Sequence, residues 1–321
     1  MIIEIFFVIL GLVILTAGGE LLIKGSTTLA KIAGVPPLII GLTIVAFGTG
    51  SPELAVSIHS SLLGKAEIAL ANVIGSNIFN IALILGIASM VGVLTVHLQL
   101  FKLDIPVMIG ATALLQLMLW NNSLSRIEGI ILFLLAVTYT IWLIRASRRE
   151  NKSDLKEELD VPSISGDKKI VILKSFVFIG LGLAGLALGA NLFVENSSNL
   201  ARAFGISERV IGLTIIAMGT SLPELMTSVV AAYRGHSDIA VGNVVGSNIY
   251  NILLIGGLSG VIAPNGLTIE ASMGRFDLPV ALGMAIICYP LFKRNHKVQK
   301  FEGLFLLTLF AIYNLFLFKN T

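Results

Sequence analysis

Residues 41–57 read GLTIVAFGTGSPELAVS and residues 212–228 read GLTIIAMGTSLPELMTS, so one apolar segment that contains a glutamate occurs twice in the chain. Eleven of the seventeen positions are identical. At the same offset of 171 residues, NVIGSNIFN at 72–80 returns as NVVGSNIYN at 243–251. Ionisable residues inside a membrane usually mark substrate or ion pathways, so this duplicated polar group within apolar sequence favours a transport function.

The composition is that of an integral membrane protein. Of the 321 residues, 55% are hydrophobic and 13% are charged, and the mean hydropathy is +0.93, whereas a soluble domain has about 25% charged residues. The small net charge of +3 gives no support for nucleic-acid binding. Cys288 is the only cysteine, which excludes a disulfide framework and a cysteine metal cluster.

Ten stretches are apolar and long enough to cross a bilayer, which requires about 20 residues per helix. The first of them lacks the basic start and the cleavage site of a secretory signal, so it is predicted to be a spanning helix. We therefore predict an all-α integral membrane protein with ten transmembrane helices, at 2–23, 37–62, 67–94, 103–120, 127–145, 171–194, 209–233, 239–263, 276–292 and 303–318.

One long polar segment, 146–170, divides the chain. We interpret it as a solvated, charged linker between a first five-helix repeat at 1–145 and a second at 171–321. Its acidic residues Glu157, Glu158 and Asp160 could in principle hold Ca²⁺, but they lack the residue pattern of an EF-hand loop. A solvated linker is the simpler interpretation.

The odd number of helices in each half predicts an inverted repeat. With five helices, the second half must enter the membrane from the opposite side, about an axis in the membrane plane. A cytoplasmic linker places 16 of the 22 Lys and Arg residues on the inner side, as the positive-inside rule requires. We therefore predict a protein of the cell (inner) membrane with a cytoplasmic linker and both termini outside.

The strongest functional candidates are Glu53 and Glu224, because a carboxylate at the bilayer centre costs at least ~2.5 kcal/mol on insertion scales. Each follows a proline in a Gly-Thr-x-x-Pro-Glu sequence. Proline removes one backbone donor and frees a carbonyl about one turn earlier. The motif thus predicts unpaired oxygen ligands beside a carboxylate, and such a ligand set suits hard cations such as Ca²⁺.

Structural interpretations stand beside the functional one. The motif glycines could permit close helix packing, and the amides of the Asn residues could bridge helices rather than line a pathway. The two glutamates could be buried carboxyls kept neutral by protonation. Glu20 and Glu195 do not correspond between the halves and are interpreted as interfacial residues near helix ends.

These motifs resemble the two alpha-repeats of the cation/calcium exchanger superfamily, specifically its prokaryotic sodium/calcium exchanger branch. The resemblance covers nearly the whole chain. It implies ten helices in two inverted halves, in which Glu53 and Glu224 bind Ca²⁺ and share their oxygens with flanking Na⁺ sites. The further ligands that it implies are the backbone carbonyls of Thr49, Thr220, Ala46 and Ala217, the hydroxyls of Ser76, Ser247 and Ser221, and the polar groups of Asn80 and Asn251.

The sequence departs from this pattern at Gly50, where the first copy lacks the usual Ser. Ser51 lies one position later, about 100° around an ideal helix, so one peripheral sodium site is in doubt. Asn80 and Asn251 are both amides, whereas some relatives have an acid there. The expected cavity therefore holds two carboxylates, and three Na⁺ per Ca²⁺, as the family suggests, would make exchange electrogenic.

The resemblance implies a secondary antiporter that exchanges Na⁺ for Ca²⁺ by alternating access. No cofactor is expected, and the transported ions and the lipid bilayer are the expected partners. An H⁺- or K⁺-coupled cation exchanger is the nearest alternative. A passive cation channel remains a further alternative, because rings of oxygen ligands also line channels. No nucleophile–base pair or phosphate loop indicates an enzyme.

Overall fold

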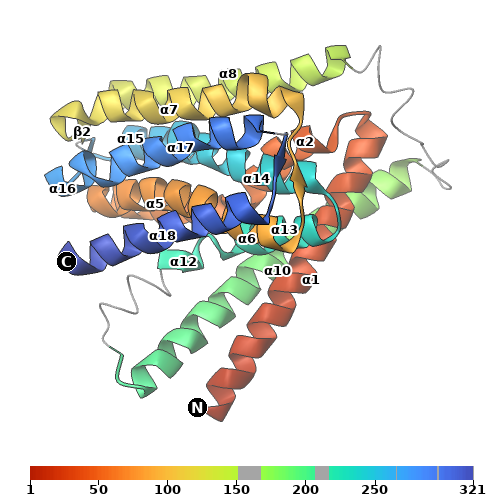
Figure 1. Cartoon of the computed structure of the whole chain (residues 1–321), viewed down its shortest axis with the longest axis horizontal. Coiled ribbons are helices and arrows are strands. Elements are labelled where there is room, and N and C mark those ends of the chain that lie inside the picture. The colour runs from red at the N-terminus through yellow and green to blue at the C-terminus, as the bar shows by residue number, and fades with distance from the viewer. Residues whose placement is uncertain (151–167, 207–216, 265, 295, 321) are drawn as a thin grey trace.

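The computed structural model describes residues 1–150, 168–206, 217–264, 266–294 and 296–320. Within these ranges the chain is almost wholly helical, and most helices run side by side in one bundle (Figure 1). The first half comprises α1 (Ile2–Ala33), α2 (Pro37–Ile40), η1 (Gly41–Val45), α3 (Ala46–Thr49), α4 (Ser51–Leu62), α5 (Ala66–Phe79), η2 (Asn80–Leu85), α6 (Gly86–Val91), β1 (Leu94–Thr95), η3 (Leu100–Asp104), α7 (Ile105–Met118), η4 (Leu119–Asn121), β2 (Ser123–Leu124) and α8 (Arg126–Glu150).

The described part of the second half follows a similar order of elements. Its described elements are α10 (Lys168–Ala203), α12 (Ala217–Gly219), α13 (Leu222–Tyr233), α14 (Ser237–Tyr250), η6 (Asn251–Gly256), α15 (Gly257–Ile262), β3 (Leu267–Thr268), α16 (Ala271–Arg275), α17 (Asp277–Lys293), β4 (Lys297–Val298) and α18 (Lys300–Asn320).

Nine of the ten predicted spans appear in the described part of the chain. Eight are helices long and apolar enough to cross a membrane, and the ninth is the pair Pro37–Thr49 and Ser51–Leu62, which is bent by 46°. The remaining predicted span, 209–233, begins outside the described residues, and α12 and α13 are its described part. The count of ten therefore stays a prediction.

The first and sixth helices are longer than predicted. α1 continues to Ala33 and ends where Gly34 adopts the left-handed conformation, with φ of 63°, which glycine adopts without steric cost. α10 runs from Lys168 to Ala203, well past its predicted end at residue 194. Both helices exceed the length that a bilayer requires, so they can tilt or extend beyond it.

Much of the predicted linker, 146–170, falls outside the described residues, as does the acidic cluster within it. α8 extends to Glu150 and α10 begins at Lys168. The end of α8 and the start of α10 lie on the right in Figure 1, whereas the C-terminus lies on the left and the N-terminus at the bottom, left of the middle. This arrangement agrees with an odd number of crossings in each half, while the exact boundaries of the two repeats stay a prediction.

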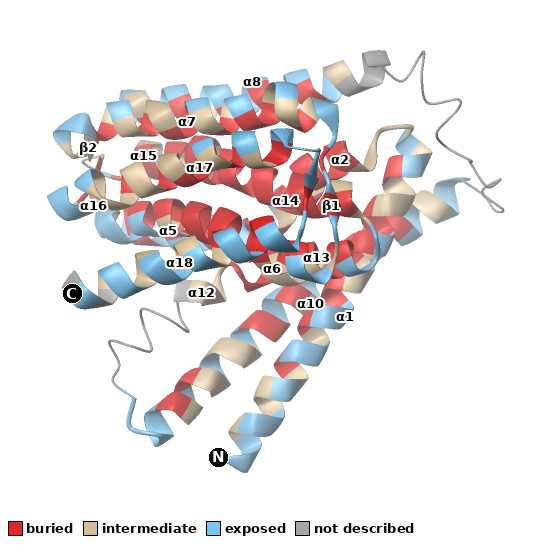
Figure 2. Cartoon of the chain, in the orientation of Figure 1, coloured by how far each residue is buried: buried red, intermediate tan, exposed pale blue. Residues whose placement is uncertain are grey.

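Two short strand pairs show how the halves are related. β1 pairs with β4, Leu94 opposite Val298, and β2 pairs with β3, Leu124 opposite Leu267. By repeat alignment β1 corresponds to β3 and β2 to β4, so the two pairs are equivalent contacts between the halves. They lie at opposite ends of the bundle (Figure 2), because α7 runs between β1 and β2.

Glycines at seven-residue intervals join α1 to α10. Gly11, Gly18 and Gly25 of α1 lie against Gly189, Gly182 and Ser175 of α10. A Cβ added at Gly18 would be 2.8 Å from the backbone nitrogen of Leu186, so only glycine permits this backbone approach. The two long helices therefore form one tightly packed pair.

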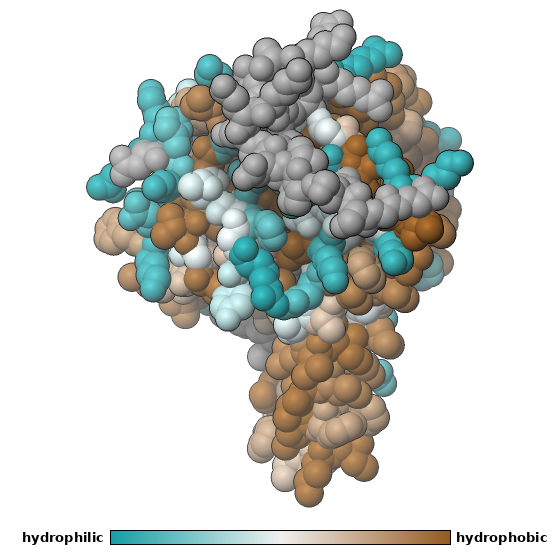
Figure 3. All heavy atoms as spheres, turned by 90° about the vertical axis from the view of Figure 1, so that its right-hand side faces the viewer, coloured by the Kyte–Doolittle hydropathy of each residue, from teal (hydrophilic) through white to brown (hydrophobic). Residues whose placement is uncertain are grey.

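The free end of this pair is apolar. The side chains of Ile2, Phe6, Ile9 and Val13 are exposed, and in Figure 3 the part that projects below the body is covered with hydrophobic residues. Exposed apolar surface of this kind matches lipid. Conversely, α5 and α14 are largely buried inside the bundle (Figure 2), so the second polar motif of each half lies at its centre.

Candidate cation site

A break in a helix positions each of the two intramembrane glutamates. α3 ends at Thr49, Gly50 lies between the helices, and α4 begins at Ser51 with Pro52 in its first turn. In the second half α13 begins at Leu222 with Pro223 in its first turn. Because proline has no N–H, the helix is interrupted just before each glutamate.

The opposite half of the molecule supplies a hydrogen-bond donor to Glu53. Its side chain is 2% exposed, and its Oε1 accepts a hydrogen bond of 2.9 Å from the Ser221 hydroxyl. The same hydroxyl lies 3.3 Å from Oγ of Ser76. Glu53, Ser76 and Ser221 therefore form one cluster of oxygens, which we call the Glu53 half-site.

Glu224 has an equivalent position with one hydroxyl fewer. It is also 2% exposed, and a Cβ added at Gly50 would lie 3.6 Å from its Oε1. Ser247 corresponds to Ser76, and its buried hydroxyl has no hydrogen-bond partner. We call Glu224, Ser247 and the backbone at Gly50 the Glu224 half-site. Ser51 does not replace the missing hydroxyl, because its Oγ donates to the Phe47 carbonyl at 3.1 Å.

Four amides join the halves at the centre of the bundle. Asn80 donates to Oδ1 of Asn248 at 2.9 Å, and Asn251 donates to Oδ1 of Asn77 at 3.1 Å. Asn77 and Asn248 also donate to each other's backbone carbonyls, at 3.2 and 3.3 Å. Because these two residues are repeat equivalents that bind each other, the two-fold relation passes between them.

A second pair of amides fixes the glutamate-bearing helices. Asn72 donates to the Glu53 carbonyl at 3.1 Å and to Oγ of Ser57 at 2.9 Å. Asn243 makes the equivalent bonds to the Glu224 carbonyl and Ser228, at 3.3 and 3.0 Å. The structure therefore supports the helix-bridging interpretation of these asparagines.

The motif threonines contact asparagines of the opposite half, whereas the motif alanines contribute only backbone polar atoms. The Thr49 hydroxyl donates to Oδ1 of Asn243 at 3.2 Å, and the Thr220 hydroxyl lies 3.5 Å from Oδ1 of Asn72. The Ala46 carbonyl accepts the N–H of Gly50, while Ala217 begins α12.

Three of the four glycines Gly48, Gly75, Gly219 and Gly246 serve packing. Gly48 lies against Leu183, Gly219 against Val194 and Gly246 against the backbone of Leu42, whereas a Cβ at Gly75 would meet nothing within 4 Å.

Several buried oxygens of this cluster have no protein partner. Such groups are costly in a membrane interior unless a ligand or water satisfies them. Among the predicted site residues they are Oε2 of Glu53, Oε2 of Glu224, Oδ1 of Asn80 and Oγ of Ser247. Elsewhere in the described chain no group of three His, Cys, Asp or Glu side chains gathers. Two carboxylates with neutral oxygens suit a hard cation such as Ca²⁺ or Na⁺ rather than zinc or copper.

A cavity of about 540 Å³ reaches this level of the bundle. On one side it is bounded by α10, including Ala187 and Asn191, and on the other by Thr49, Pro52 and Thr220. Because it touches both helix breaks, it provides an approach to the oxygen cluster. We call it the α4–α10 cavity.

The sequence matches the sodium/calcium exchanger protein family over residues 3–145 and again over 174–319. The chain belongs to this family. The two matched segments correspond to its two halves, as the duplicated motifs require.

Several relatives match over most or all of the chain. Inner membrane protein YrbG of Escherichia coli is 35% identical, with 88% of this chain and 87% of that protein aligned. Putative antiporter CaxA of Alkalimonas amylolytica is also 35% identical, over 100% of both chains. Sodium/calcium exchanger MaX1 of Methanosarcina acetivorans is 33% identical, over 98% and 99%.

Solved structures of the exchanger NCX_Mj have the same fold. The structure soaked with 2.5 mM Na⁺ and 0.1 mM Ca²⁺ superposes with a TM-score of 0.82 at 30% identity, covering 97% of each chain. This match confirms the predicted fold class, a helical membrane protein of the exchanger type.

Three features of this exchanger chain were not predicted. The helices that carry the site contain π-helical segments, η1 before Ala46, η2 from Asn80 and η6 from Asn251, and such segments often occur at functional sites. Tyr139 donates to Asp104 at 2.8 Å and Tyr313 to Asp277 at 2.9 Å. The sequence Asp-x-Pro occurs at 104–106 and again at 277–279, and this repetition is a sequence signal for the two equivalent contacts.

The third feature corrects the interpretation of Glu20. It does not lie at a helix end, but inside α1, where it forms an ion pair with Arg234. Glu195 lies within α10. α1 and α10 are longer than predicted, so these residues are further from the helix ends than the sequence indicated.

Proposed function

We propose that the chain is a secondary antiporter that exchanges Na⁺ for Ca²⁺ across the membrane by alternating access. The observation that carries this proposal is the crosswise arrangement of Glu53 and Glu224, each buried and facing the glycine–threonine segment of the other half. The names of the relatives MaX1 and NCX_Mj support these ions as substrates.

Charge balance supports competition between the two ions. Glu53 and Glu224 together carry two negative charges, which one Ca²⁺ or two Na⁺ would neutralise. The unpartnered oxygens of both half-sites supply further ligands, in line with the six to eight oxygens that Ca²⁺ takes. Because the same carboxylates bind either ion, binding of Na⁺ displaces Ca²⁺, which is the basis of exchange.

The proposed ligands divide into a centre and two flanks. Glu53 and Glu224 bind Ca²⁺ at the centre with the carbonyls of Thr49 and Thr220, next to Asn80 and Asn251. One flank comprises the Glu53 half-site with the carbonyl of Ala217, and the other the Glu224 half-site with the carbonyl of Ala46. The crosswise hydrogen bond from Ser221 to Glu53 supports this division.

We also propose that the protein lies in the cell (inner) membrane with the segment between α8 and α10 in the cytoplasm and both termini outside. The distribution of Lys and Arg supports this orientation, and the E. coli relative is named an inner membrane protein. In this orientation α4 ends at the outer face, and the α4–α10 cavity lies toward it.

The test is ⁴⁵Ca²⁺ flux in proteoliposomes, with Na⁺, K⁺ and H⁺ gradients imposed one at a time. We expect uptake only when Na⁺ is inside and absent outside. Uptake driven by the pH gradient alone would contradict this proposal and indicate a proton-coupled exchanger. Uptake that requires K⁺ in addition to Na⁺ would indicate a potassium-dependent exchanger. Ca²⁺ entry without any trans cation would indicate a channel.

Electrogenicity tests the charge balance. If three Na⁺ exchange for one Ca²⁺, each cycle that brings Ca²⁺ in moves one net positive charge out, so a potential that is positive inside should accelerate Na⁺ exit coupled to Ca²⁺ entry and a negative one should slow it. A rate independent of valinomycin-clamped potential would indicate two Na⁺ per Ca²⁺.

The matched control for all fluxes is Glu67→Gln, because Glu67 is an exposed acid at the start of α5.

A further inference from the structure

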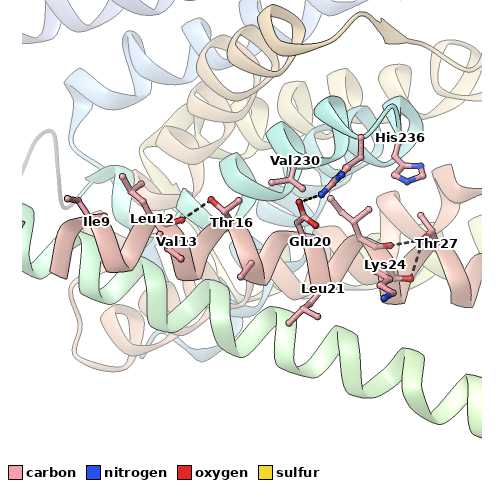
Figure 4. Close-up of a pocket in the computed structure, with 13 residues that line it drawn as sticks. Ile9, Leu12, Val13, Thr16, Glu20, Leu21, Lys24, Thr27, Val230 and His236 are labelled. Atoms are coloured by element: carbon pink, nitrogen blue, oxygen red, sulfur yellow. Dashed lines mark hydrogen bonds and ion pairs between the residues drawn. The ribbon is translucent and has the colours of Figure 1, made fainter. Parts of the chain in front are cut away.

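An ion pair joins α1, one member of the long α1–α10 pair, to the end of α13 in the bundle. Oε1 of Glu20 binds Nη2 of Arg234, which follows the last residue of α13. The two side chains are 43% and 50% exposed. They lie in a cavity of about 930 Å³ between α1 and the end of α13 (Figure 4), which we call the α1–α13 cavity.

This cavity and the α4–α10 cavity are the two repeat copies of one cleft. At the offset of 171 residues, the α1 residues that line the first correspond to the α10 residues that line the second. The corresponding residues are Leu12 and Leu183, Thr16 and Ala187, Glu20 and Asn191, and Ile23 and Val194.

The two cavities differ in whether they reach the glutamate motifs. Thr49 and Thr220 line the α4–α10 cavity, whereas no described residue of 41–57 or 212–228 lines the α1–α13 cavity. Met226 of α13 is half-buried beneath α1, with its carbonyl 3.5 Å from a Cβ added at Gly19. Its repeat equivalent Ala55 is exposed and lines the open cavity.

The two copies also differ in charge. Glu20 corresponds to Asn191 and Arg234 to Leu63, and an amide and an alkyl chain cannot form an ion pair. Burial and the nearby Lys31 lower the pKa of His236, so the imidazole beside Arg234 tends to be neutral and does not compete with the guanidinium for Glu20. The ion pair therefore exists on the side where the approach to the site is closed.

We infer that Glu20 and Arg234 form a one-sided latch, which holds α1 against α13 and keeps the α1–α13 passage closed. This inference rests on the proposed alternating access. Because the glycine contacts bind α1 tightly to α10, the latch acts on both helices together. The latch stabilises the state in which the α4–α10 cavity provides the approach to the cation site. The Glu20–Arg234 ion pair must break before the α1–α13 passage opens.

The test uses two single-cysteine reporters at equivalent positions. Cys288 is buried and is the only native cysteine, so Cys288→Ser provides the background for Ala55→Cys or Met226→Cys. The rate of reaction with a water-soluble maleimide is measured on purified protein. In the parent we expect fast labelling at position 55 and slow labelling at position 226.

Glu20→Gln or Arg234→Gln should raise the labelling rate at position 226 by roughly 2- to 5-fold, the range expected for one accessible ion pair, and lower the rate at position 55. The charge swap Glu20→Arg with Arg234→Glu should restore both parent rates. Transplanting the pair as Asn191→Glu with Leu63→Arg should slow labelling at position 55.

Labelling rates that stay at the parent values in both Glu20→Gln and Arg234→Gln would overturn the latch. A charge-swapped protein that labels at the rates of these neutralised variants would overturn it as well. A variant that fails to fold is recognised by its gel-filtration profile, and the swap and transplant then decide the matter. Labelling requires no transport, so loss of ⁴⁵Ca²⁺ exchange in the parent would reject the proposed function while leaving the latch to be judged from the maleimide rates.

Discussion

The Glu53 and Glu224 half-sites occupy equivalent places in the two halves but differ in one hydroxyl. Glu53 accepts a 2.9 Å hydrogen bond from Ser221, whereas Glu224 faces Gly50, which has no side chain to offer. Ser76 contacts Ser221, whereas the equivalent Ser247 has no partner. One half-site is therefore internally bonded, and the other has more unpartnered oxygens.

In this inverted repeat, a substitution in one half therefore alters the half-site that contains the glutamate of the other half. Gly50 is three residues before Glu53 in the chain, but it faces Glu224, so Glu224 is the carboxylate that lacks a hydroxyl partner. Each half-site combines a glutamate from one repeat with the helix break of the other. The two half-sites should therefore differ in affinity for Na⁺, and the Glu224 half-site should bind more weakly.

The largest effect expected is that of removing either carboxylate. Glu53→Gln and Glu224→Gln each take away one of two charges, and loss of a charged ligand should reduce Na⁺-driven ⁴⁵Ca²⁺ flux by on the order of 100-fold or more, given the dependence of Ca²⁺ affinity on ligand charge. Flux above about a tenth of the parent rate in either variant would contradict the shared central site, provided that Glu67→Gln is fully active.

The next largest effect concerns the bonded half-site. Ser221→Ala removes the hydroxyl that binds Glu53, and hydrogen bonds to charged groups contribute about 1.5–3 kcal/mol. We expect the Na⁺ concentration for half-maximal exchange to rise by roughly 10-fold, with a smaller change for Ca²⁺. Measuring both ions in Ser247→Ala provides the comparison, and an equal Na⁺ shift in the two variants would remove the difference between the half-sites.

A smaller effect in the opposite direction is expected from Gly50→Ser. The new hydroxyl would start from a Cβ 3.6 Å from Glu224 Oε1, but that Cβ would also lie 3.0 Å from the Ala46 carbonyl. The favourable hydrogen bond to the carboxylate, at about 1.5–3 kcal/mol, is thus partly offset by crowding. Half-maximal Na⁺ should fall by about 3-fold, while Gly50→Ala, which adds the crowding alone, should not lower it.

The smallest effect is expected from Ser51→Ala. Its hydroxyl donates to the Phe47 carbonyl, one turn earlier in α3, and such a local bond is often neutral or slightly unfavourable to a helix. Na⁺ and Ca²⁺ dependence should change by less than about 2-fold. A Na⁺ shift as large as that of Ser221→Ala would show that Ser51 takes over the role of the missing hydroxyl.

Much of the architecture follows from the sequence alone. The two halves, the apolar spans and the central Glu53 and Glu224 are visible because repetition and hydropathy are local properties of the chain. The crosswise pairing of Glu53 with Ser221 could not be predicted, since it depends on the relative position of residues 168 apart.

The Glu20–Arg234 pair was hidden for a similar reason. It joins residues 214 apart, and only the folded chain shows that they meet. Helix lengths were underestimated, because hydropathy measures the apolar stretch of α1 rather than the point at which Gly34 ends the helix.

The two strand pairs have a consequence for how the protein is held together. β1–β4 and β2–β3 each bond one half to the other, at opposite ends of the bundle, and α1 of the first half packs along α10 of the second. Neither half keeps its partners when it is alone. Co-expressed as separate polypeptides, residues 1–150 and 168–321 should therefore assemble into a two-chain complex, which is detected when a tag on either polypeptide co-purifies the other.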